Sequence, residues 1–164
     1  MLTRSVLILS LCVLAACGEQ PPTEAPTPTP TPTAPPAAVP AAPAGLPRTP
    51  APAGAAAYII SPENGATVGN PVTVVFGLKG IGVVPAGIER PDAGHHHLLI
   101  DTDVPPLDLP IPADMQHVHF GQGQTETQLT LSPGTHRLQL LLGDHLHVPH
   151  DPPILSEAVT IEVR

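Results

Sequence analysis

The chain carries nine histidines, and all of them lie between residues 95 and 150. Within that span the pattern His-x-His occurs three times, at His95/His97, His117/His119 and His145/His147. Residues two apart on a β-strand point to the same face at a spacing of ~6.5–7 Å, so each pattern places two imidazoles side by side. Imidazole is the commonest metal ligand in proteins, and two such rings can reach one ion at ~2.0–2.1 Å. The pattern therefore predicts a site rich in histidine nitrogen.

We expect the three pairs to converge into one surface site, on the side of the sheet away from the core. The candidate ligands are His95, His97, His117, His119, His145, His147 and His150. Nearby carboxylates at Asp101, Asp144 and Asp151 add oxygen donors. Not all of these residues can bind one ion. Nitrogen and oxygen donors without thiolate or thioether suit Zn(II), Cu(II) or Ni(II) and disfavour Cu(I), and we expect Cu(II) or Zn(II).

The sequence positions of the two other histidines indicate structural roles. His136 shares the parity of inward-facing leucines after a Pro-Gly turn, and we expect its ring to bond a loop carbonyl. His96 shares the parity of Leu98 and Ile100, which is typical of a core histidine.

Three functions remain open for the paired histidines. They bind a divalent transition metal or another small polar ligand, or they brace the Pro-rich loops through hydrogen bonds, or they hold the metal of an enzyme. The serines give little support to catalysis, because Ser61, Ser132 and Ser156 all lie beside turns and the G-x-S-x-G motif is absent from the chain. We therefore expect a non-enzymatic domain.

The N-terminus predicts export and lipid anchoring. Arg4 precedes an apolar run that is shorter than the ~20 residues needed to span a membrane, so residues 1–16 indicate a signal peptide. Leu14-Ala15-Ala16-Cys17 matches the lipobox of bacterial lipoproteins, and lipid on Cys17 would anchor the chain to a membrane of the cell envelope. The domain would then face the periplasm or the cell exterior.

The positions of the two cysteines and the net charge exclude several kinds of site and partner. Cys12 lies in the predicted signal peptide and Cys17 at the predicted lipid site, so no thiol is left for a disulfide, a Cys-based metal site or a Cys nucleophile. The formal net charge of −8 argues against nucleic acid as a partner. Without tryptophan, the chain also has little aromatic surface on which bases or sugars could stack.

Composition divides the chain further. Residues 17–56 are rich in Pro, Ala and Thr, which predicts a disordered, extended stalk. From residue 57 to 164 the sequence is globular, with alternating apolar residues in short runs between turns. We expect strands at 58–61, 71–78, 95–102, 117–121, 125–131, 135–144 and 157–164, with a further short one at 81–84. Prolines and glycines interrupt every candidate helix. About seven short strands predict an all-β sandwich of immunoglobulin-like type.

Several of these segments together resemble a known bacterial envelope family. The segments are GHHHLLID at 94–101, IPAD at 111–114, HVHFGQGQTE at 117–126, GTH at 134–136 and GDHLHVPHDPP at 143–153. They are similar to the family catalogued as domain of unknown function 4399, over roughly residues 58–164. The resemblance implies an exported, often lipid-anchored β-domain and brings no established activity.

Overall fold

The computed structural model describes residues 45–164, which form strands, turns and loops without a helix. In this part of the chain there is accordingly no helix with the length and apolar character needed to span a membrane. The predicted signal peptide, Cys17 and most of the predicted stalk lie outside the described residues. The nine strands are β1 (Ala56–Ser61), β2 (Thr67–Val68), β3 (Val72–Lys79), β4 (Gly82–Val83), β5 (Ala93–Ile100), β6 (His117–His119), β7 (Glu126–Leu129), β8 (Gly134–Gly143) and β9 (Val159–Val163).

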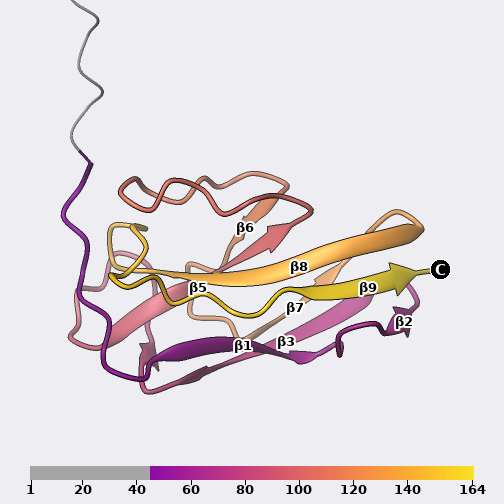
Figure 1. Ribbon diagram of the computed structural model, residues 1–164, viewed down its shortest axis with the longest axis horizontal. Helices are drawn as coiled ribbons and strands as arrows, with labels where there is room; N and C mark the ends of the chain where they lie inside the picture. The colour runs from indigo at the N-terminus through magenta and orange to yellow at the C-terminus, as the bar shows by residue number, and fades with distance from the viewer. Residues whose placement is uncertain (1–44) are drawn as a thin grey trace, which may run out of the picture. The chain divides into compact units, whose positions relative to one another are not determined.

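The strands form two sheets, and the predicted all-β sandwich is confirmed (Figure 1). One sheet has the order β1-β3-β7, and the other has the order β2-β9-β8-β5-β4, with β6 also paired to β5. Taken in chain order, these pairings correspond to the A-B-E and G-F-C sheets of immunoglobulin-like domains. The two-residue strand β2, which pairs parallel to β9, was not predicted.

The main core lies between the sheets, where strands with alternating sequences turn their apolar side chains inward. On β3 these are Val72, Val74 and Phe76, each at most 2 % exposed. On β8 the inward residues are Leu138, Leu140 and Leu142. The period-2 pattern of the sequence therefore identified the inner face of both strands correctly.

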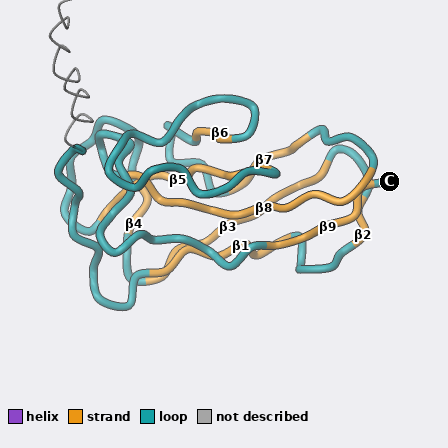
Figure 2. Tube along the Cα trace, turned by 45° about the horizontal axis from the view of Figure 1, so that its top comes forward, coloured by secondary structure: helices purple, strands orange, loops and turns teal. Residues whose placement is uncertain are grey.

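Strand β5 differs from the others because all eight of its residues are buried. Its inward side contributes Leu98 and Ile100 to the main core. Its outward side is covered by the connections that follow β5 and β8, which Figure 2 draws in teal. Leu99 packs there with Ile111 and Leu141 in a second, smaller apolar cluster. The face away from the core is thus an interior surface beneath loops.

Strand β5 ends at Ile100, two residues before its predicted end at residue 102. Asp101 has a φ of 53°, in the left-handed region that an extended strand does not use. Asp101 and the residues after it therefore turn away from the sheet and begin the long connection to β6.

The folded part also begins earlier than the composition indicates. Ala51 N–H donates to Asp151 O at 2.8 Å, and Asp151 N–H donates to Thr49 O at 2.9 Å. Leu46 N–H donates to Asp108 O at 2.7 Å. Residues 45–55, which the sequence assigns to the stalk, therefore lie against the domain, since a Pro-rich segment can still pair at a sheet edge where few of its N–H groups are needed.

Candidate functional site

Four imidazole rings meet beneath the loops on the outward side of β5. His95 and His97 come from β5, His119 comes from β6, and His147 comes from the loop after β8. We call these four residues the His cluster. Ring centroids lie 4.8 Å apart for His95/His97, His95/His147 and His119/His147, 5.0 Å for His95/His119 and His97/His119, and 5.9 Å for His97/His147.

Strand register brings three of these rings together. β5 and β6 run antiparallel with His97 opposite His119, so the two side chains project from neighbouring positions on one face. The rings of His97 and His119 are nearly parallel, with an interplanar angle of 27°. His95 follows two residues earlier on β5 and points to the same side.

Gly143 supplies the space into which the rings pack. It lies opposite His95 at the end of β8. A Cβ at this position would lie 2.9 Å from Cε1 of His97 and 3.3 Å from Cα of His147. The absence of a side chain at residue 143 therefore permits the close approach of the rings.

Asp144 shapes the loop that carries His147. This carboxylate is 2 % exposed, and its Oδ1 accepts hydrogen bonds from the backbone N–H groups of Leu146 at 2.8 Å and Val148 at 3.0 Å. His147 between them has a φ of 68°, a left-handed conformation that non-glycine residues adopt at a cost of ~1–3 kcal/mol. His147 O also accepts a hydrogen bond from the N–H of Ile111 at 2.9 Å. The loop thus holds a strained backbone that directs His147 toward β5.

The ring nitrogens at the centre of the cluster have no hydrogen-bond partners. His95 and His97 are fully buried, and within residues 45–164 neither Nδ1 nor Nε2 of either ring is paired. Nε2 of His119 is likewise buried without a partner in this part of the chain. Buried polar groups are nearly always paired, so an unpaired set at one point requires an explanation.

Burial and mutual repulsion keep these rings neutral. Burial, followed by the charges that His147 and His119 would carry, lowers the pKa of His95 from 6.5 to about 4, against a raising effect of Asp144. Burial, followed by the neighbouring histidines, lowers the pKa of His97 to about 2. Burial and His147 also lower the pKa of His119. The rings of His95, His97 and His119 are therefore neutral at pH 7, the form in which imidazole binds metals.

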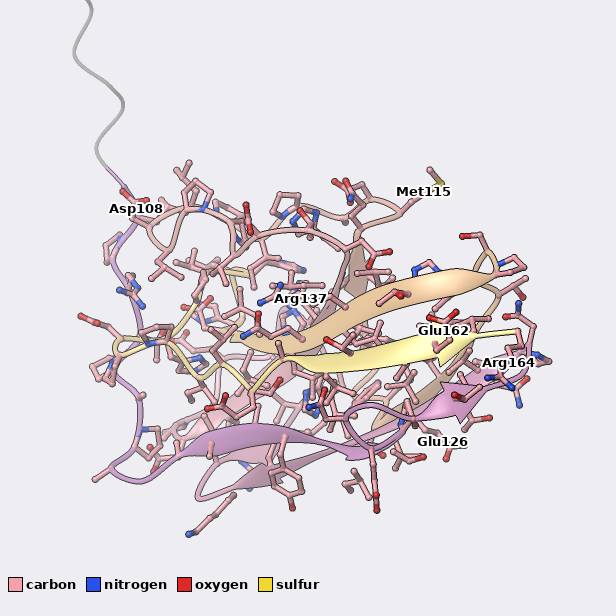
Figure 3. The ribbon with its side chains drawn as sticks, turned by 45° about the vertical axis from the view of Figure 1, so that its right-hand side comes forward. Asp108, Met115, Glu126, Arg137, Glu162 and Arg164 are labelled. Atoms are coloured by element: carbon pink, nitrogen blue, oxygen red, sulfur yellow. The ribbon has the colours of Figure 1, made fainter. Side chains whose placement is uncertain are left out.

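Nitrogen is the donor that the cluster offers. One ring nitrogen from each of His95, His97 and His119 can be chosen so that the three atoms all lie within 4.8 Å of one another. Met115, the only methionine after Met1, is 91 % exposed at the surface (Figure 3), so no thioether from residues 45–164 joins the cluster. Three neighbouring imidazole nitrogens are a donor set for Zn(II), Cu(II) or Ni(II).

His95 and His97 are fully buried and His119 and His147 are half-buried, so the prediction of an open surface site is wrong. His95 and His97 lie, as predicted, on the side of β5 away from the main core. The sequence pattern did not indicate that the connections after β5 and β8 cover that side.

The other three candidate ligands lie elsewhere. His117 Nδ1 is 2.8 Å from Asp114 Oδ1, so this carboxylate holds the ring. His145 lies on the wall of a surface hollow of about 170 Å³. It does not accompany His147, because the alternation of a strand does not apply to residues 144–147, where the chain turns. His150 is buried near the backbone of Ala93 and Leu142, without a hydrogen bond of normal geometry to its ring in the described chain.

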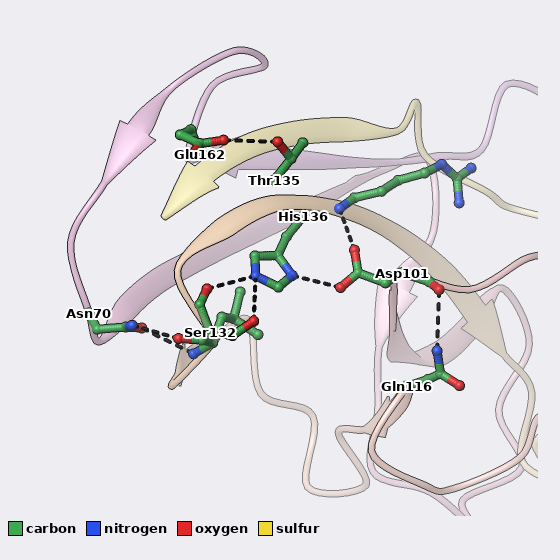
Figure 4. A network of polar contacts seen from close by, with 9 residues as sticks. Asn70, Asp101, Gln116, Ser132, Thr135, His136 and Glu162 are labelled. Carbon is green, nitrogen blue, oxygen red and sulfur yellow. Dashed lines mark hydrogen bonds and ion pairs between the residues drawn. The ribbon is translucent and has the colours of Figure 1, made fainter. Parts of the chain in front are cut away.

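The two histidines assigned to structural roles have them. His136 Nδ1 donates to Asp101 Oδ2 at 2.6 Å, and its Nε2 donates to the carbonyl oxygen of Ser132 at 2.9 Å (Figure 4). The Asp101 hydrogen bond, followed by that of Ser132, raises the pKa of His136. His96 packs in the core with its ring centroid 5.0 Å from that of Phe76, but neither of its buried ring nitrogens has a hydrogen-bond partner in the described chain.

Sequence reasoning missed two contributors, Gly143 and Thr49. In the sequence, Gly143 is simply the residue before a polar, His-rich turn. Nothing at that place in the sequence indicates that the ring of His97 packs against its Cα. Thr49 lies in the segment assigned to the stalk, yet its Oγ1 donates to Asp144 Oδ2 at 2.6 Å.

Comparison with known proteins places the domain in a family. The family model described as Domain of unknown function (DUF4399) matches residues 74–164, more than half of the chain, and the chain belongs to this family. The matched region runs from β3 to the C-terminus and includes all nine histidines. Neither a curated protein nor a solved structure matches the chain.

Gly143→Ala should destabilise the metal-free chain by about 1–3 kcal/mol, because the new methyl group would lie only 2.9 Å from Cε1 of His97 and 3.3 Å from the backbone of His147. Urea unfolding measures the difference. Gly69→Ala is the matched control, since a Cβ there has no neighbour within 4 Å. Equal free energies of unfolding for the two variants would contradict the packing described for Gly143.

Asp101→Asn should lower the pKa of His136 by removing the charge that raises it, and an NMR titration of the ring would record the change. Because the folded pKa exceeds the ordinary value of 6.5, the Asp101–His136 pair contributes stability that is fully present below pH 6.5 and is lost as pH rises through the folded pKa. The difference in the free energy of unfolding between the parent and Asp101→Asn should therefore become smaller as the pH rises. A difference that grows with pH would refute this role.

Proposed function

We propose that the domain binds one divalent transition-metal ion, Cu(II) or Zn(II), through His95, His97 and His119, with His147 as a fourth ligand. The observation that supports this most directly is the meeting of neutral, unpaired imidazole nitrogens within 4.8 Å in a buried place. A tetrahedral ion bound at ~2.0–2.1 Å needs ligand atoms ~3.3 Å apart. Small rotations of the rings would bring the nitrogens to that spacing.

The energetic cost of the unpaired ring nitrogens favours a ligand. A buried polar group without a partner costs about 1–3 kcal/mol, and several such groups share this cluster. A bound ion would pair with one nitrogen of each ring. The ion would also be attracted by the carboxylate of Asp144. The charge of this group acts on His95 and would offset part of the positive charge of the ion.

The bracing alternative describes different histidines better. His136 and His117 each hold a carboxylate, as a brace does. The rings of His95 and His97 make no such contact to any described residue. This contrast supports a ligand-binding role for the His cluster.

Metal titration tests the proposal. The chain, purified without a histidine tag or chelators, should bind one Cu(II) or Zn(II) more tightly than about micromolar, roughly −8 kcal/mol. His119→Ala should weaken binding by at least about 100-fold, since loss of mere supporting contacts already costs 10–100-fold. His145→Ala, with a ring outside the cluster, should bind as the parent does. Absence of binding at micromolar concentration, or equal losses in both variants, would refute the site.

We further propose that the domain is carried on a lipid anchor at Cys17 in the bacterial envelope, which the Leu14-Ala15-Ala16-Cys17 motif supports. In a bacterial host, the parent should incorporate labelled fatty acid and partition into the membrane fraction. Cys17→Ser should lose both properties. Unchanged labelling of the variant would show that Cys17 is not the acylated residue.

A further inference from the structure

A short segment before β1 lies across the loop that carries His147. We call residues 46–51 the N-terminal strap. Arg48 Nε donates to the carbonyl of Pro149 at 3.0 Å, and its Nη1 lies 3.2 Å from Asp151 Oδ1. Arg48 Nη2 donates to the carbonyl of His150. Together with the backbone pairing around Asp151, these contacts fasten the strap to the second half of the loop.

Thr49 connects the strap to the His cluster. Its hydroxyl donates to Asp144 Oδ2 at 2.6 Å, while Asp144 Oδ1 accepts the N–H groups on either side of His147. The two oxygens of one buried carboxylate therefore join the strap to the backbone that holds His147 in its left-handed conformation. Loss of the Thr49 hydroxyl would leave Asp144 Oδ2 without this partner.

The strap also forms part of the wall of the hollow of about 170 Å³. Thr49, Asp144 and His145 line this hollow together with Ala93, the first residue of β5. His95 follows Ala93 by two residues on that strand. The hollow thus lies beside the start of β5 and beside the loop after β8, which both carry members of the His cluster.

We infer that the N-terminal strap is a latch on the His147 loop, and that Thr49 is a positioning residue that acts through Asp144. The strap sets how often the loop opens, and thereby the rate at which a metal ion enters and leaves the His cluster. This inference rests on the proposed metal-binding function. It assigns a role in the site to a segment whose composition indicates only a stalk.

Two measurements on the full chain test the latch. The first is amide hydrogen exchange at Leu146, His147 and Val148 in the metal-free protein. The second is the rate of Zn(II) release into an excess of chelator. Thr49→Val keeps the shape of the side chain and removes its hydroxyl. It should accelerate both the amide exchange and the Zn(II) release by about tenfold, because the variant lacks a hydrogen bond to a charged group that the parent makes only while the loop is closed. Thr49→Ser restores the hydroxyl and should restore both rates.

Thr135→Val is the matched control, because Thr135 Oγ1 also donates to a carboxylate, Glu162 Oε2, at 2.9 Å. It lies at the start of β8, away from the loop that follows the end of that strand. This variant should leave the exchange of residues 146–148 and the release rate unchanged.

The outcomes separate the latch from the metal site. Equal exchange at residues 146–148 in Thr49→Val and Thr135→Val would overturn the latch. So would faster exchange spread evenly over β5, β8 and β9, because the strap would then stabilise only the whole fold. A parent chain that binds no Zn(II) or Cu(II) would refute the proposed function and the control of ion exchange, while hydrogen exchange would still decide whether the strap holds the loop.

Discussion

Burying imidazole nitrogens without hydrogen-bond partners is the constraint on which the rest of this structure depends. Each such nitrogen gives up its contact with water, and in His95 and His97 nothing in the described chain replaces it. A fold of marginal stability tolerates this arrangement only when the surrounding elements hold the rings in place. Here Gly143 opens the space, and the loops after β5 and β8 close over it.

The same constraint explains a division of roles among the histidines. Where a carboxylate is available, as for His136 and His117, the ring serves as a brace. His96 is an aromatic component of the core beside Phe76. In the His cluster, the rings of His95 and His97 have no hydrogen-bond partner among the described residues, and burial keeps both rings uncharged. Neutral rings gathered in this way suit a cation, because each can turn a lone pair toward it.

Sequence patterns predicted the strands and the sandwich because alternation reports directly which face of a strand is buried. The same alternation correctly put His95 and His97 on one side of β5. It could not distinguish His145 from His147, because the segment turns and His147 has a positive φ. The alternation also could not predict that loops cover the cluster, since this depends on the paths of the Pro-rich loops.

The N-terminal strap shows a related limit of composition. A segment rich in Pro and Ala predicts disorder because it can bury little apolar area. The contacts of Arg48 and Thr49 are polar and specific, so average composition does not reveal them. Such contacts depend on where the partner loop lies in three dimensions, which only the folded structure provides.

X-ray absorption spectroscopy at the metal edge of the loaded chain tests the central claim most directly. The account predicts a first shell of three or four nitrogens at ~2.0–2.1 Å, with the outer-shell scattering of imidazole rings and no sulfur. That pattern should lose a nitrogen in His119→Ala. A shell dominated by oxygen without imidazole scattering would show that any bound ion lies outside the His cluster, and would contradict the account.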